Sequence, residues 1–101
     1  MTDNRIEIIA EIANAHQGNP EQAAKLAQAG FEAGADAVKF QMYFAEELLV
    51  RRHLRFEHFL NQSFSPDVWA KLIAGAKANG PVYCDVFGLQ AVELATDLGV
   101  D

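Results

Sequence analysis

Two short segments decide the fold of this chain: Ile8-Ile9-Ala10-Glu11-Ile12 and, further along, Asp36-Ala37-Val38-Lys39-Phe40-Gln41. Each segment is an apolar run with an ionisable residue near its carboxyl-terminal end, and the residues between them have a helical pattern. Parallel α/β enzymes place charged groups at the carboxyl ends of neighbouring strands, where the side chains meet in one pocket. A charge inside a buried sheet is unfavourable unless it is paired or used. Glu11 and Lys39 are therefore predicted to share a pocket.

The rest of the chain repeats this alternation of strand and helix. Asn19-Pro20 and Ser65-Pro66 each place a capping side chain before a proline, which is typical of a helix start. Residues 44–64 are interpreted as a long excursion, with a helical turn or two around Glu46 to Leu49. We expect strands at 6–12, 37–43 and 81–87, and helices at 20–33, from 66 to the glycine at 80, and at 89–98.

This order predicts an α/β fold in which right-handed crossovers join parallel strands and the helices lie outside. It corresponds to the first three βα units of a (β/α)₈ TIM barrel. A complete barrel takes about 250 residues, whereas this sequence has 101. Residues 1–101 are therefore interpreted as the N-terminal portion of a barrel domain, within a longer chain.

Composition limits the possible partners. The formal net charge of −6 argues against nucleic acid or an anionic membrane as the main partner. No apolar run approaches the roughly 20 residues of a membrane span, and the N-terminus lacks the apolar core of a signal peptide. The single cysteine, Cys84, fits a reducing compartment and is interpreted as a buried strand residue. We expect a cytoplasmic protein.

The alternation of side chains along a strand predicts which residues face the pocket. On this basis one face of the sheet carries a polar residue late in each strand. These residues are Glu11 in the first strand, Lys39 and Gln41 in the second, and Asp85 in the third. Glu11 and Lys39 could also be a structural ion pair, and Lys39 could bind a phosphate or carboxylate or form a Schiff base. Gln41 could bind a hydroxyl or amide group or make a hydrogen bond at the rim, and Asp85 could be a pocket acid or cap the following turn.

Other candidates lie in the loops. His16 occupies the loop after the first strand, where active-site residues gather, although a loop histidine is often only a local hydrogen-bonding group. Arg51, Arg52 and Arg55 form a solvated surface or, alternatively, a lid over an anion. The histidines and the lone cysteine have no metal-ligand spacing, and no glycine-rich phosphate loop or nucleophile elbow is present.

Three motifs resemble the N-terminus of the sialic acid synthase family, the phosphoenolpyruvate-condensing synthases of N-acetylneuraminate and related nonulosonates. They are Ile-Ile-Ala-Glu-Ile at 8–12, His16-Gln17-Gly18, and Ala-Gly-Ala-Asp-Ala-Val-Lys-Phe-Gln at 33–41, followed by Ala45-Glu46-Glu47-Leu48. The resemblance covers nearly the whole chain, and the block Ala-Asp-Ala-Val-Lys-Phe-Gln is its most specific part.

The resemblance implies a (β/α)₈ barrel followed by an antifreeze-like domain, working as a homodimer. It implies a transferase that joins the methylene carbon of phosphoenolpyruvate to the aldehyde of an N-acetylated amino sugar, with release of phosphate. By position, Glu11 would be the catalytic acid/base, Lys39 would hold the phosphoenolpyruvate anion, and Gln41 would contact the sugar; His16 and Asp85 are further substrate-binding candidates. The implied divalent metal, manganese or magnesium, would find none of its ligands in these residues.

The chain also departs from the family pattern. The usual loop Glu-Ile-Gly-x-Asn-His-x-Gly has alanine here at positions 13 and 15, and the usual Ser-Thr-Pro-Phe-Asp of the third strand is replaced by Cys84-Asp85-Val86-Phe87-Gly88. Two alternative functions therefore stay open. One is a non-catalytic truncated barrel that acts by self-association or by binding a partner, and the other is a Schiff-base aldolase that uses Lys39.

Overall fold

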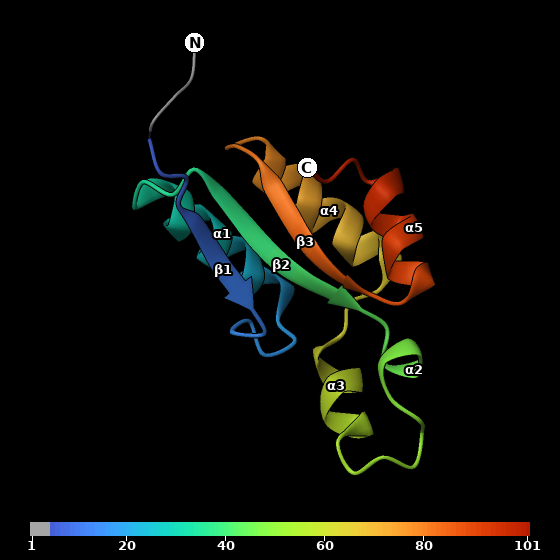
Figure 1. The fold of residues 1–101 in the computed structure, drawn as a ribbon. Helices are drawn as coiled ribbons and strands as arrows, with labels where there is room; N and C mark the ends of the chain where they lie inside the picture. Colours follow the sequence, from blue (N-terminus) through green and yellow to red (C-terminus); the bar gives the residue numbers. More distant parts are fainter. Residues whose placement is uncertain (1–4) are drawn as a thin grey trace.

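The structure, a computed structural model, describes residues 5–101 and alternates strands with helices (Figure 1). The predicted order of parallel strands and helices is confirmed, with one helix that the sequence pattern did not predict, α3. The elements are β1 (Ile9–Ala13), α1 (Pro20–Glu32), β2 (Ala37–Tyr43), α2 (Ala45–Leu48), α3 (Phe56–Gln62), α4 (Pro66–Lys77), β3 (Val82–Phe87) and α5 (Leu89–Asp97).

The three strands form one parallel sheet in the order β1-β2-β3, so β2 is central. Its residues Val38, Phe40 and Met42 are fully buried, because they face the helices, which lie on one side of the sheet (Figure 1). The opposite face carries Lys39 and Gln41, as the alternation predicted. In the described residues this opposite face is open, and that is where the candidate site lies.

Helices α1 and α4 begin as the cap-and-proline signals predicted. The Asn19 side chain accepts hydrogen bonds from the backbone N–H groups of Glu21 and Gln22, and the Ser65 hydroxyl accepts one from Val68. Each bond satisfies a backbone donor that has no partner within the helix. These caps fix where each helix leaves the carboxyl edge of the sheet.

The core lies between the sheet and these helices. Trp69 of α4 packs edge-on against Phe40 of β2, with ring centroids 5.9 Å apart, and against Phe64 at 5.1 Å. Helix α1 packs on the same face of the sheet and approaches it closely at Gly30, where an added Cβ would lie 2.9 Å from the Cβ of Ala10. The small residues of α1 therefore set the distance between this helix and the strands.

Strand β1 begins at Ile9, so the prediction of a strand from residue 6 was wrong at its start. The Asp36 carboxylate explains the difference, because it accepts the backbone N–H of Ile8 at 2.8 Å in place of a ladder partner. Asp101 repeats this arrangement beside β3: its carboxylate accepts the N–H of Val82 at 3.0 Å, and its own N–H donates to the Val82 carbonyl at 2.7 Å.

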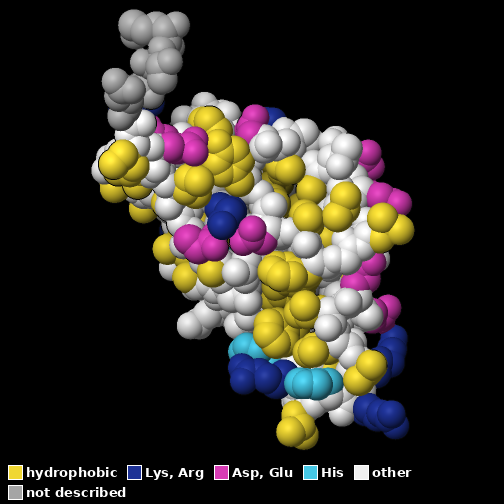
Figure 2. Space-filling model, in the orientation of Figure 1, with side chains coloured by type: hydrophobic (Ala, Val, Ile, Leu, Met, Phe, Trp, Pro, Cys, Tyr) yellow, Lys and Arg dark blue, Asp and Glu magenta, His cyan; other side chains and the backbone are white. Residues whose placement is uncertain are grey.

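Residues 49–62, named the arm here, project from the body of the molecule and end in α3 (Figure 1). Arg51, Arg52 and Arg55 are exposed, as predicted for a solvated surface, and Leu54 at the tip is 99% exposed. Figure 2 shows basic and histidine side chains gathered at this end of the molecule. Among residues 5–101, no helix is long and apolar enough to span a membrane.

Candidate active site on the open face of the sheet

The site is built by the register of the three strands. Glu11 of β1 lies directly opposite Lys39 of β2, and Gln41 lies directly opposite Asp85 of β3. Residues directly opposite or diagonal to each other on one face of a sheet have side chains within reach of one another. The sequence prediction that these polar residues share one face is therefore confirmed.

Lys39 is the centre of the cluster. Its Nζ lies 3.6 Å from Oε1 of Glu11 and 3.4 Å from Oδ2 of Asp85. The side chains are 31% exposed for Lys39, 43% for Glu11 and 42% for Asp85. The expectation of charges hidden within the sheet is thus corrected, since the face that carries them is open (Figure 2).

Electrostatics keep Lys39 protonated. The hydrogen-bonding contact with Asp85 and then the negative charge of Glu11 raise the pKa of Lys39 above its ordinary value of 10.5. A Schiff-base lysine needs the opposite shift, because only the neutral amine attacks a carbonyl carbon. The observed environment therefore favours Lys39 as a fixed positive charge.

His16 is not brought into this cluster. It is only 2% exposed, and its ring lies against Phe64 with centroids 4.6 Å apart. Its Nδ1 accepts the backbone N–H of Gly18 at 2.9 Å, so Nε2 carries the proton in the neutral ring. Burial lowers the pKa of His16. A role in substrate binding stays a prediction for this residue.

Cys84 is half-buried on the helix side of β3, less covered than the sequence predicted. Burial, with the nearby charge of Asp85, raises the pKa of its thiol to about 12. A thiol with this pKa is almost entirely protonated at neutral pH and is a poor nucleophile. Its protonated state and its place against the core, on the side of β3 away from Lys39, argue against Cys84 as the nucleophile of the site.

Several contacts around the site could not be found from the sequence, because they join residues far apart in the chain. The Tyr83 hydroxyl donates to the Glu7 carboxylate at 2.9 Å, on the same face as Asp85. The Tyr43 hydroxyl donates to the Asn14 amide oxygen at 3.3 Å. The Glu47 carboxylate accepts the backbone N–H of Gln90 at the start of α5. Tyr83 lies two positions before Asp85, so alternation along β3 puts both on one face, but nothing in the sequence pattern indicates the partner of Tyr83.

The cluster does not fit a divalent metal. Metal sites need several carboxylate, imidazole or thiolate ligands directed at one point, and residues 5–101 contain no such group of three. The Lys39 ammonium also lies between Glu11 and Asp85, where a cation bound by both carboxylates would have to sit.

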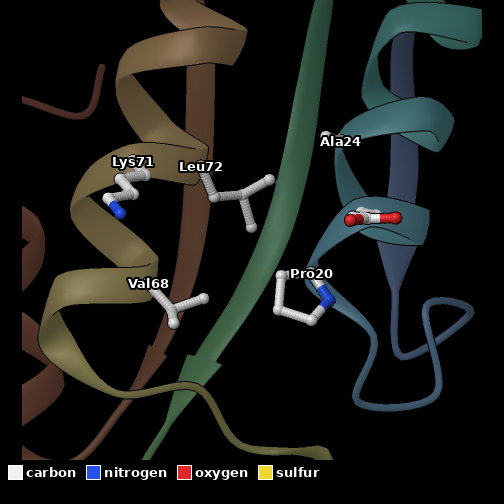
Figure 3. A pocket seen from close by; sticks show the side chains of 6 residues that line it. Pro20, Ala24, Val68, Lys71 and Leu72 are labelled. Carbon is white, nitrogen blue, oxygen red and sulfur yellow. The ribbon is translucent and has the colours of Figure 1, made fainter.

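A separate hollow of about 240 Å³ lies on the helix side of the molecule, between α1 and α4 (Figure 3). Val68 and Leu72 of α4 point toward Pro20 and Ala24 of α1 across it (Figure 3). The surface of this hollow is almost wholly apolar; its two charged residues, Glu21 and Lys71, are both exposed and form no ion pair with each other that would mark a site. We therefore place the candidate site at the Glu11–Lys39–Asp85 cluster.

The fold matches the N-terminal part of a sialic acid synthetase. One similar structure is the N-acetylneuraminic acid (sialic acid) synthetase from Leptospira borgpetersenii serovar Hardjo-bovis, solved in complex with citrate. The two share 21% sequence identity at a TM-score of 0.83, over 99% of this chain and 38% of the synthetase chain. No family model matches the sequence, and no curated protein matches it. The likeness therefore establishes the fold of this chain, which spans well under half of the synthetase.

Proposed function

We propose that this chain forms one wall of the active site of a sialic acid synthase-like transferase, as part of a longer protein that works as a homodimer. The observation that carries the proposal is the Lys39 ammonium, held 3.6 Å from Glu11 on the open face of a sheet with the synthetase fold. The motifs at 8–12 and 33–41 support the same reading, since they supply these two residues.

The proposed reaction joins phosphoenolpyruvate to the aldehyde of an open-chain N-acetylated amino sugar. The methylene carbon forms the new carbon–carbon bond, water adds at the enol carbon, and phosphate leaves by cleavage of its bond to that carbon. The aldehyde oxygen gains a proton and the attacking water loses one. A carboxylate within hydrogen-bond reach can carry out such transfers, and we assign this role to Glu11.

Lys39 is assigned to the anion. Phosphoenolpyruvate carries several negative charges, which a fixed ammonium can position and offset. Gln41 offers both a donor and an acceptor beside this group and is assigned to the hydroxyl or amide groups of the sugar. The divalent metal stays an expectation from the resemblance.

The test uses the full protein that contains this chain. With phosphoenolpyruvate and N-acetylmannosamine as substrates, Lys39→Ala should raise the KM for phosphoenolpyruvate by about tenfold or more, because the anion loses its nearest cation. Glu11→Gln should lower kcat by about a hundredfold or more while the KM changes little, because general acid–base catalysis contributes about that much. Release of phosphate and formation of the condensation product are measured together.

The role of Lys39 would be refuted by an unchanged KM in Lys39→Ala, and the role of Glu11 by an unchanged kcat in Glu11→Gln. Failure of the unaltered full protein to form product would refute the proposed reaction itself. Borohydride trapping with pyruvate tests the aldolase alternative, which requires a covalent adduct at Lys39.

The second candidate function is a non-catalytic module that acts by self-association. The observation that favours it is exposed apolar surface on the open face of the sheet, where Ile9 of β1 and Phe87 of β3 are both exposed. Large exposed apolar patches mark interaction sites in soluble proteins. Light scattering of the 101-residue chain tests this function, because self-association would make the apparent mass increase with concentration.

A further inference from the structure

The Lys39 ammonium contacts two carboxylates, one from each neighbouring strand. Asp85 lies nearer than Glu11, at 3.4 Å against 3.6 Å from Nζ. Asp85 is also the diagonal neighbour, since Tyr83 is the residue directly opposite Lys39 and Asp85 lies opposite Gln41. The Lys39 side chain therefore reaches along the sheet toward Asp85, away from its direct neighbour on β3.

The charges of the cluster do not balance. With all three side chains ionised, one ammonium and two carboxylates sum to a net charge of −1. The contact with Asp85 is also the largest contribution that raises the pKa of Lys39. An anion that approaches Lys39 therefore meets an ammonium already paired, with two negative charges beside it.

We propose that Asp85 is an internal counter-ion that competes with an anionic substrate for the Lys39 ammonium, and that it thereby sets the anion affinity of the site. This inference rests on the proposed function, because it concerns the group assigned to phosphoenolpyruvate. It makes Asp85 a residue that determines specificity and acts through Lys39. An anion binds by replacing the Asp85 carboxylate beside Nζ, whereas an uncharged ligand can accept a hydrogen bond from Lys39 without displacing Asp85.

The experiment measures binding of phosphoenolpyruvate alone to the full protein that contains this chain, by titration calorimetry or by chemical shifts. Asp85→Asn keeps the size of the side chain and removes its charge, so it should tighten binding of phosphoenolpyruvate by about tenfold, because like charges placed together are strongly unfavourable. The matched control Asp85→Glu keeps the charge and should stay within about twofold of the unaltered protein. Thermal unfolding verifies that each variant is folded.

Two further measurements separate competition from a structural role of Asp85. Binding of N-acetylmannosamine, an uncharged sugar, should be the same in Asp85→Asn and in the unaltered protein. Adding Lys39→Met to Asp85→Asn should abolish the gain in anion affinity, since the two residues act on one group.

The proposal is overturned if Asp85→Asn binds phosphoenolpyruvate no more tightly than the unaltered protein, or if neither binds it. It is also overturned if the gain survives in the double variant, or if the uncharged sugar gains equally. Failure of the proposed function would be seen in a different measurement, the formation of condensation product. In that case the full protein makes no condensation product, although Asp85→Asn still tightens anion binding.

Discussion

His16 shows at the scale of one residue how burial decides what a side chain can do. The ring packs against Phe64, and its Nδ1 accepts the N–H of Gly18. Protonation would turn this acceptor into a donor and would place a charge in a buried position. Its environment therefore favours the neutral ring, in agreement with a lowered pKa.

This shift predicts how stability depends on pH. Because the folded protein lowers the pKa of His16 from 6.5, the unfolded chain binds more protons there as the pH falls. The contribution of His16 to the free energy of unfolding should therefore be constant above about pH 7.5. It should decrease as the pH falls below 6.5, so the protein becomes less stable. Urea unfolding at pH 7.5, 6.5 and 5.5 measures this decrease.

The matched variants are His16→Gln, which removes the buried titrating group, and His53→Gln, which removes an exposed histidine of the arm. The decrease between pH 7.5 and 5.5 should shrink in the first and persist in the second. An equal decrease in His16→Gln and in the unaltered chain would rule out His16 as its source.

At the scale of elements, two glycines within helices occupy opposite environments. Gly30 of α1 faces the sheet, and a Cβ there would lie 2.9 Å from the Cβ of Ala10 and 3.3 Å from Cγ1 of Val38. Gly75 of α4 is exposed, and a Cβ there would meet nothing within 4 Å. Neither position has the left-handed backbone that favours glycine.

The same substitution should therefore have opposite effects at these two positions. Gly30→Ala should destabilise the protein by about 1–3 kcal/mol, because the added methyl group forces α1 away from β1 and β2. Gly75→Ala should stabilise it by about 0.5–1 kcal/mol, because alanine has the higher helix propensity. The free energy of unfolding of both variants, measured in urea, tests the pair. Destabilisation by both substitutions, or by neither, would contradict the close approach of α1 to the sheet.

At the scale of the whole molecule, the open face of the sheet combines the charged cluster with exposed apolar residues. Ile9 is 40% exposed and Phe87 is 39% exposed at opposite edges of this face. Burial of such surface is favourable by roughly 25 cal/mol per Å². We therefore predict that the 101-residue chain self-associates through this face, with an apparent mass in light scattering that increases with concentration.

The double variant Ile9→Thr with Phe87→Thr should weaken this association, because it removes apolar surface and keeps residues suited to strands. The control is Leu54→Gln at the tip of the arm, an exposed apolar residue away from the sheet. A monomeric mass at every concentration would refute the prediction, and so would equal weakening by the control.

The sequence predicted the large features because their signals are local. Apolar runs, a proline after a capping residue, and a glycine soon after α1, α4 and α5 are all signals that lie within a few positions of the element they mark. The alternation along β2 likewise placed Lys39 and Gln41 on the face opposite Val38 and Phe40. The helix α3 was missed because its cap residue, Arg55, makes no side-chain capping bond and the segment lies within a long polar excursion.

The sequence by itself determined the parallel α/β order and the identity of the polar residues that share one face. Only the tertiary structure decided which of them meet. Strand register places Glu11 opposite Lys39 and brings Asp85 nearer still, while burial against Phe64 keeps His16 apart from them. The physical reason is that alternation along a strand depends on backbone geometry alone, whereas register and burial depend on packing between segments distant in the chain.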